Sequence, residues 1–125
     1  MPSNINRGPR QIWAAFIWSM QGLRAGWRVE ASFRLEVILC VILFPIGLWL
    51  GDGAIEKALL AGSLLPVLAA EMLNSGLEAI VDKLWPEYDV IAGRAKDMGS
   101  AAVFLLMANV LVIWVVILGA RTGAW

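Results

Sequence analysis

Residues 58–84 read ALLAGSLLPVLAAEMLNSGLEAIVDKL, and this stretch decides the fold. Its first half is a continuous apolar run, which is typical of a membrane-spanning helix. Its second half carries four polar residues at spacings of three, four and four: Glu71, Asn74, Glu78 and Asp82. These spacings put the four side chains, here called the polar stripe, on one face of a helix. Carboxyl groups are costly in a membrane, so the polar stripe indicates a functional site.

The composition indicates a single membrane domain. The chain has 125 residues, of which 60% are hydrophobic. Its mean hydropathy of +0.74 is higher than a soluble domain of this length needs to fill its core. We therefore expect the bilayer to be the solvent for most of the chain.

Charge and residue usage exclude several classes of function. Ten basic residues balance ten acidic ones, whereas a nucleic-acid-binding domain would be clearly basic. The sequence has no histidine, which removes the commonest general base and the usual zinc ligand. The single cysteine, Cys40, lies in an apolar run, where a buried and unreactive thiol is expected. Catalysis would therefore depend on carboxylates, lysine or arginine.

The N-terminal part predicts a helix that lies on the membrane surface. Residues 1–9 are rich in proline, glycine and asparagine and are expected to form a mobile arm. Residues 10–30 carry apolar side chains on one side and arginines on the other, as an interfacial amphipathic helix does. A buried helix of a soluble bundle is the alternative for this segment.

Three later segments predict membrane-spanning helices, which makes the expected fold an all-α membrane protein. The spans are expected at about 34–50, 54–84 and 98–120, with a polar loop at 85–93. Pro45 and Pro66 are expected to kink the first two spans.

The basic residues predict the orientation of the chain. Five arginines precede the first span, and three basic residues lie between the second and third: Arg7, Arg10, Arg24, Arg28 and Arg34, then Lys83, Arg94 and Lys96. Basic residues favour the cytoplasmic side. The N-terminus and the 85–93 loop are therefore expected in the cytoplasm, and the C-terminus in the periplasm. The polar stripe lies toward the cytoplasmic side.

The charged side chains at this interface predict a particular chemistry. Glu30 joins the polar stripe at this depth, and basic residues lie close to it: Arg24, Arg34, Arg94 and Lys96. Carboxylate and amide oxygens suit Mg²⁺, which often arrives with a nucleotide phosphate. Lysine or arginine can hold phosphate oxygens, and a partly buried glutamate can act as a general base. These are the parts that phosphoryl transfer needs.

Three classes of function fit these features. A membrane-embedded phosphotransferase is the first, although the sequence has no Walker A pattern and no glycine-rich kinase loop. A proton- or cation-coupled transporter subunit that uses the glutamates as a relay is the second. A structural or assembly subunit is the third. The interfacial helix and the additional basic residues favour the first, and the lack of an internal repeat argues against a transporter.

Two motifs resemble the signature of the small bacterial membrane diacylglycerol kinases. They are EMLNSGLEAIVD at 71–82 and GRAKDMGSAAV at 93–103. The segments GLRAGW at 22–27 and EASFRLE at 30–36 resemble that family in order and spacing. The likeness extends from about residue 10 to residue 120.

The resemblance implies an activity and an assembly. Family members phosphorylate a lipid hydroxyl from MgATP, as homotrimers with one interfacial and three spanning helices per subunit and active sites between subunits. It implies that this chain converts diacylglycerol to phosphatidic acid in the bacterial inner membrane. Undecaprenol kinases share the signature, so a polyprenol acceptor is the alternative.

The resemblance also implies roles for individual residues. Glu71 would be the catalytic base, and Glu30 and Glu78 would bind the Mg²⁺ that accompanies ATP. The nucleotide would contact Glu30, Glu78, Glu87, Tyr88, Asp89, Lys96 and Asp97. The lipid would contact Arg24, Ala25, Trp27, Ser32, Phe33, Arg34, Glu71 and Ser100. Asn74, Asp82 and Arg94 would support these groups.

Some positions differ from the family pattern, and one role has a simpler alternative. The differences are Gln11, Trp18, Met20 and Gln21. They concern contacts to phosphate and lipid headgroup and leave the predicted base and metal ligands intact. Asp82 could instead simply balance the charge of Lys83 at the end of its helix.

Overall fold

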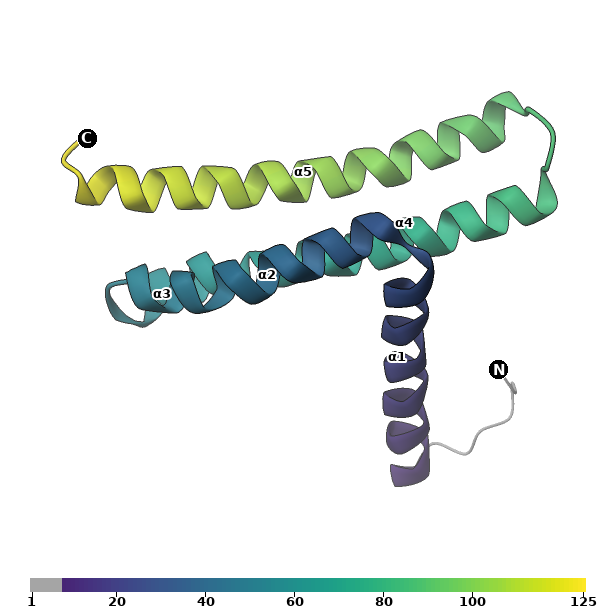
Figure 1. Ribbon diagram of the computed structural model, residues 1–125, viewed down its shortest axis with the longest axis horizontal. Coiled ribbons are helices and arrows are strands. Elements are labelled where there is room, and N and C mark those ends of the chain that lie inside the picture. Colours follow the sequence, from purple (N-terminus) through teal and green to yellow (C-terminus); the bar gives the residue numbers. More distant parts are fainter. Residues whose placement is uncertain (1–7) are drawn as a thin grey trace.

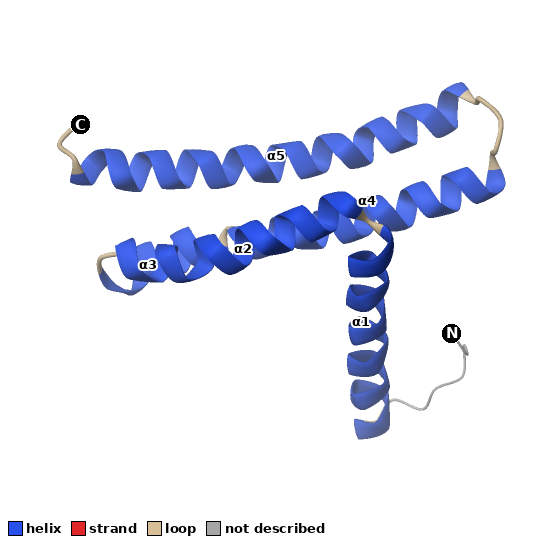
Figure 2. Cartoon of the chain, viewed as in Figure 1, coloured by secondary structure: helices blue, strands red, loops and turns tan. Residues whose placement is uncertain are grey.

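The computed structural model describes residues 8–125, and every regular element in that part of the chain is an α-helix. The helices are α1 (Pro9–Val29), α2 (Ala31–Leu50), α3 (Gly53–Gly62), α4 (Leu64–Leu84) and α5 (Val90–Arg121). Helices α2, α4 and α5 run along a common direction, whereas α1 projects sideways from the start of α2 (Figure 1). Short loops join them (Figure 2). Most of the expected N-terminal arm lies outside the described residues, and Pro9 already belongs to α1.

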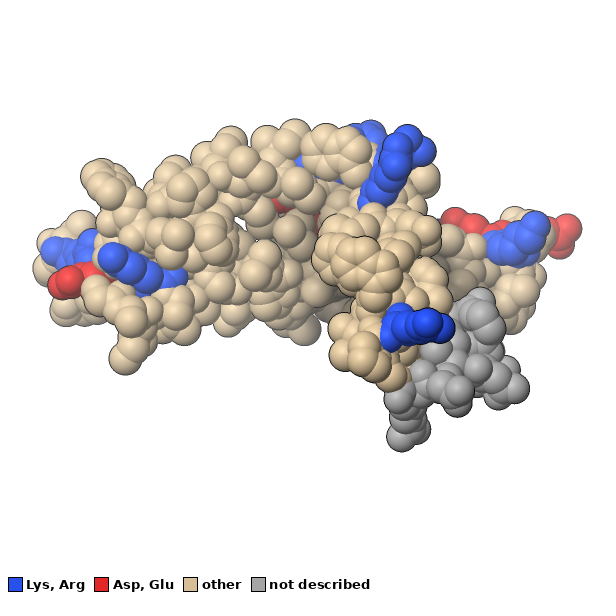
Figure 3. Space-filling view, turned by 90° about the horizontal axis from the view of Figure 1, so that it is seen from below, with Lys and Arg blue, Asp and Glu red and all other residues tan. Residues whose placement is uncertain are grey.

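Three stretches of the described chain are long and apolar enough to cross a membrane: Ala31–Leu50, Gly53–Leu84 and Val90–Arg121. Figure 3 shows charged side chains at both ends of the long axis and around α1, with a largely uncharged surface between α1 and the α3 end. A surface of this kind is stable in lipid, where helices satisfy their own backbone hydrogen bonds. The expected all-α membrane fold is therefore confirmed, and the trimer stays a prediction.

Helix α5 begins earlier than the sequence predicted. A polar loop was expected at 85–93 and a span from about 98, but the helix starts at Val90. The loop prediction is therefore wrong for residues 90–93. The Asp89 carboxylate accepts a hydrogen bond from the Ala92 N–H at 2.8 Å and so caps the helix. This cap lets the helix begin among polar residues, before its apolar part starts. Hydropathy alone does not reveal such a start.

The second span is interrupted close to the expected kink. Helix α3 ends and α4 begins on either side of Ser63. Pro66 follows, and a proline has no N–H for the carbonyl four residues earlier, which is that of Gly62. The Trp114 indole N–H donates to the Leu60 carbonyl at 3.1 Å and ties α5 to this interruption.

Helix α2 packs closely against α3 at Gly47. A Cβ atom there would come within 3.1 Å of the backbone of both Leu60 and Ala61, and the Leu60 side chain is fully buried. Small residues let helices in a membrane approach in this way. Pro45 lies in the same turn and does not interrupt α2.

We expect Gly47→Ala to lower the free energy of unfolding by about 1–3 kcal/mol, because the added methyl group meets backbone atoms that cannot move aside. Gly93→Ala is the matched control, since no atom lies within 4 Å of a Cβ built there. Thermal unfolding in detergent micelles, followed by circular dichroism, measures both. Equal stability of the two variants would contradict the close contact between α2 and α3.

Candidate active site

Glu71 is the deepest member of the polar stripe. Its side chain is buried in α4 and accepts a hydrogen bond from the Ser32 hydroxyl in the first turn of α2. Ser75, one turn further along α4, is also buried. A buried carboxylate without a hydrogen-bond donor would be costly, so the start of α2 stabilises Glu71. The predicted base and a predicted lipid-contacting residue are thus brought together.

Asn74 and Glu78 form a second group on the same face of α4. The Asn74 side-chain amide donates to the Glu78 carboxylate at 3.4 Å. The Asn74 Oδ1 atom is buried without a hydrogen-bond partner and lies against Gly99 of α5, where a Cβ atom would collide with it. A buried oxygen without a partner, next to a carboxylate, is a donor set that fits a hard cation such as Mg²⁺.

The expected metal ligands, Glu30 and Glu78, do not form a closed metal site within residues 8–125. No group of three or more Asp, Glu, His or Cys side chains in this part of the chain is arranged to hold an ion. Mg²⁺ bound with nucleotides usually takes one or two carboxylates and completes its coordination with phosphate and water. Asn74 and Glu78 fit that mode, so Mg²⁺ binding stays a prediction.

Asp82 pairs with Lys96 across α4 and α5. The Lys96 ammonium lies 2.8 Å from the Asp82 carboxylate. The ion pair of Asp82 is thus with a residue of another helix rather than with its neighbour Lys83. Both side chains are partly exposed, so the pair contributes little to stability. Its effect is to hold the Lys96 ammonium near the C-terminal end of α4.

A hollow of about 230 Å³ lies between this ion pair and the loop that joins α4 to α5. Five predicted site residues line it: Asp82, Glu87, Tyr88, Asp89 and Lys96. The Tyr88 side chain is exposed, whereas the Asp89 carboxylate already caps α5. Asp89 therefore has a role in the fold in addition to its predicted nucleotide contact.

A groove of about 280 Å³ runs between α1 and α4. Small residues from both helices line it, among them Gly22, Ala25, Gly26, Gly76 and Ala79. Glu30, at the junction of α1 and α2, lies at the same groove beside Ser75. The groove thus brings a predicted metal ligand and a predicted lipid-contacting residue, Ala25, alongside α4.

Two predicted lipid-contacting residues have partners within the fold. Phe33 is buried, and its ring would lie 3.2 Å from a Cβ atom added at Gly26. The Arg34 guanidinium donates to the carbonyls of Trp27 and Arg28, at 3.0 and 3.2 Å, at the end of α1. Phe33 and Arg34 therefore fix the angle between α1 and α2.

The remaining predicted residues lie on the surface of the chain. They are Arg24, Ala25 and Trp27 on α1, and Arg94, Asp97 and Ser100 on α5. Within residues 8–125, no hydrogen bond or ion pair joins their side chains to Glu71. A single chain therefore brings part of the predicted site together and leaves the rest apart.

Sequence reasoning gave no role to Glu36, which the structure places near Glu71. Its side chain is buried, its Oε2 atom has no hydrogen-bond partner, and it lies one turn after Ser32, which donates to Glu71. Ser32 and Glu36 are four residues apart on α2 and so share one face. The same spacing that revealed the polar stripe on α4 could have found this residue.

Comparison with known proteins places the chain in a family. A family model described as prokaryotic diacylglycerol kinase matches residues 17–118. The chain belongs to this family. A relative from Escherichia coli K12, named diacylglycerol kinase, is 40% identical over 121 residues, which cover 97% of this chain and 99% of that protein.

Further members with the same name show a comparable likeness. The Haemophilus influenzae protein is 43% identical over 97 residues, covering 78% of this chain and 82% of that protein. The Pseudomonas aeruginosa protein is 40% identical over 111 residues, covering 89% of this chain and 90% of that protein. Family membership makes the chain an enzyme of the kinase class. It supports the phosphotransferase interpretation over the transporter and assembly alternatives.

We expect Gly99→Ala to lower kinase activity by about 10- to 100-fold, because a methyl group there would displace the Asn74 amide, and small misplacements in an active site are costly. Gly62→Ala, in α3 and outside the predicted site, has open space around its Cβ and is the control. Steady-state rates of the two purified variants measure the effect. If Gly99→Ala kept full activity, the position of Asn74 would not matter for catalysis.

Proposed function

We propose that this chain transfers the γ-phosphate of ATP to the hydroxyl group of diacylglycerol and forms phosphatidic acid. The observation that carries the proposal is the buried Glu71 carboxylate, which already accepts a hydrogen bond from a hydroxyl group, that of Ser32. An acceptor lipid presents the same chemical group. The curated relatives are named diacylglycerol kinases, and the family model bears the same name.

In the proposed mechanism, Glu71 takes the proton of the lipid hydroxyl as the hydroxyl oxygen attacks the γ-phosphorus. The bond from the γ-phosphorus to the β–γ bridging oxygen breaks, and ADP leaves with that electron pair. The Asn74 amide donates a hydrogen bond to the Glu78 carboxylate, and the two side chains are proposed to bind the phosphate groups next to Glu71. Lys96, positioned by Asp82, contacts the phosphate oxygens. Mg²⁺, held by Glu30 and Glu78, would offset the negative charge on the phosphates.

The nucleotide is proposed to lie over the hollow at the α4–α5 loop. Glu87, Tyr88 and Asp89 line this hollow together with Lys96. Asp97 follows Lys96 on an exposed turn of α5. The adenine end would therefore lie at the loop and the phosphates nearer to Glu78.

The enzyme is proposed to work in the bacterial inner membrane with its site at the cytoplasmic face. Three helices of the described chain are long and apolar enough to span a bilayer, and the relatives are bacterial. Basic residues are concentrated before the first span and around the α4–α5 loop, which supports a cytoplasmic location for these parts and a periplasmic one for the C-terminus.

The enzyme is proposed to act as a homotrimer with active sites shared between subunits. Within residues 8–125, Arg24, Arg94 and Asp97 make no hydrogen bond or ion pair with Glu71, and no three acidic side chains are grouped to hold an ion. A neighbouring copy could supply the missing groups.

We expect Glu71→Gln to lower kcat by about 10²- to 10⁴-fold, since this is what a positioned general base contributes. The assay follows labelled phosphate from ATP in mixed micelles that contain diacylglycerol and undecaprenol side by side. Glu56→Gln is the control, because Glu56 pairs with Arg121 at the other end of the helices. Label in phosphatidic acid that disappears in Glu71→Gln supports the proposal. Label only in the polyprenol would identify an undecaprenol kinase.

We expect Glu78→Gln to raise the Mg²⁺ concentration needed for half-maximal activity by at least about tenfold, because one anionic oxygen ligand is lost. A Mg²⁺ titration of the wild type, Glu78→Gln and Glu56→Gln measures this shift. EDTA should abolish the activity of all three. Activity that persists in EDTA would show that the metal assignment is wrong.

A further inference from the structure

Helix α1 is held against the rest of the chain near its C-terminal end. It projects sideways from the other helices (Figure 1), and Gly26 is the only buried residue within it. Gly26 lies in the last turn, and its carbonyl accepts a hydrogen bond from the N–H of Glu30 at 2.9 Å. A contact that fixes Gly26 therefore also fixes the backbone of Glu30, the proposed Mg²⁺ ligand.

Met72 of α4 makes such a contact. A Cβ atom at Gly26 would lie only 2.6 Å from the Met72 sulfur, and one at Gly22 would lie 3.9 Å from its terminal methyl group. Gly22 and Gly26 are one turn apart, so Met72 lies across a notch formed by the two glycines. The other α4 residues in the groove between α1 and α4 are short: Ser75, Gly76 and Ala79. Met72 is therefore the long side chain of α4 that reaches α1.

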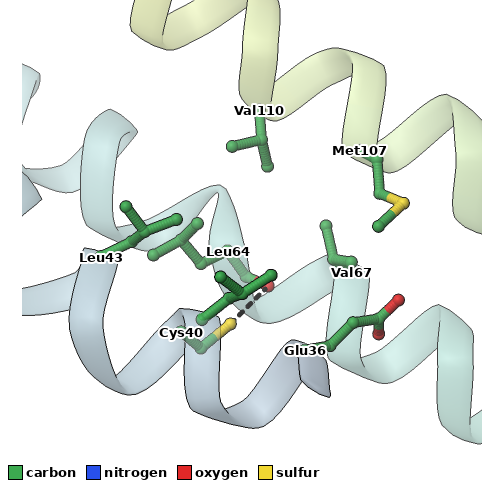
Figure 4. A pocket seen from close by; sticks show the side chains of 8 residues that line it. Glu36, Cys40, Leu43, Leu64, Val67, Met107 and Val110 are labelled. Atoms are coloured by element: carbon green, nitrogen blue, oxygen red, sulfur yellow. Dashed lines mark hydrogen bonds between the residues drawn. The ribbon is translucent and has the colours of Figure 1, made fainter. Parts of the chain in front are cut away.

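Neighbouring residues of α4 meet different helices. Val67 lies among side chains of α2 and α5 (Figure 4). Glu71, one turn further on, accepts a hydrogen bond from Ser32 of α2. Met72 is rotated by about 100° from Glu71 around the helix axis, and it points to α1 instead. The proposed catalytic base and the contact with α1 therefore belong to the same turn of α4.

Two other contacts at the end of α1 do not replace Met72. Phe33 packs at Gly26, and the Arg34 guanidinium binds the last carbonyls of α1. Both residues belong to α2, so they fix the angle between α1 and α2. The position of α1 relative to α4 depends on Met72.

We propose that Met72 is a positioning residue, which holds the end of α1 through the glycine notch and so keeps Glu30 at the groove beside Ser75. The inference rests on the proposed function, in which Glu30 helps to bind Mg²⁺. It adds that the affinity for the cation depends on an apolar side chain outside the site. Groups that orient metal ligands contribute to affinity in this way.

Distances between spin labels test the contact without an assay of activity. The labels are attached at Ile12→Cys on α1 and Ile80→Cys on α4, both exposed positions, in a Cys40→Ala background. Labelled protein is diluted with excess unlabelled protein, so that each distance lies within one chain. We expect Met72→Ala to broaden the distance distribution about twofold, because α1 loses its contact with α4. Leu65→Ala, at an exposed position on α4, is the control. Equal widths in the two variants would overturn the proposal.

Binding of Mn²⁺, a paramagnetic substitute for Mg²⁺, tests the consequence for the cation. Its affinity for the protein in micelles is measured by electron paramagnetic resonance, with adenylyl imidodiphosphate present and without a lipid acceptor. We expect Met72→Ala and Gly26→Ala each to weaken this affinity about tenfold, which is a usual effect of losing an orienting group. Gly62→Ala, with open space at its Cβ, and Leu65→Ala should leave it unchanged. Wild-type affinity in Met72→Ala would overturn the proposal.

A double variant separates positioning from a general loss of stability. In the Met72→Ala background the methyl group added at position 26 has room, so Gly26→Ala should cause no further loss of Mn²⁺ affinity. The Phe33 ring contacts that methyl group in both backgrounds, so it does not contribute to the difference. Losses that add in the double variant would overturn the proposal. Circular dichroism checks the helix content, and Met72→Val, which also lacks the sulfur, replaces Met72→Ala if that variant does not fold.

These measurements keep the inference apart from the proposed function, because neither needs lipid turnover. A wild type that shows the coupling of Met72 with Gly26 but phosphorylates no lipid would overturn the proposed function alone. An active enzyme in which Met72→Ala changes neither the distances nor the Mn²⁺ affinity would overturn the inference alone.

Discussion

A carboxylate inside an apolar helix bundle needs hydrogen-bond donors, and Glu71 imposes this requirement on the whole chain. The donor is Ser32, which lies in the first turn of α2. That turn is held in place by two neighbours, because Phe33 packs at Gly26 and Arg34 binds the last carbonyls of α1. The contacts of the first turn of α2 therefore determine both the sideways direction of α1 and the position of Glu71.

The polar stripe passes from a buried to a solvated environment along α4. Glu71 is 6% exposed, whereas the Asp82 side chain is 64% exposed. This gradient suits the proposed reaction, in which the lipid hydroxyl would be reached at depth and the nucleotide from water. The same gradient lowers the cost of placing several carboxylates on one membrane helix.

The sequence predicted what depends on local periodicity and missed what depends on contacts between helices. The spacing of Glu71, Asn74 and Glu78 was sufficient to place them on one face. The first helical turns after Asp89 were missed, because a single side-chain cap outweighs the polar composition there. The pairing of Asp82 with Lys96 could not be read from spacing, since it depends on how α4 and α5 lie together. The roles of the individual site residues stay predictions.

The interruption at Ser63 divides the second span into two rods that meet at one residue. The 32 residues of this span would extend roughly 48 Å as one helix, well beyond the ~30 Å of hydrocarbon in a bilayer. An unbroken rod would transmit any change of tilt to Glu71. The break beside Pro66 lets the two halves of the span follow different neighbours: α3 packs on α2 at Gly47, whereas α4 lies along α5. The excess length of the span therefore need not tilt the half that carries Glu71.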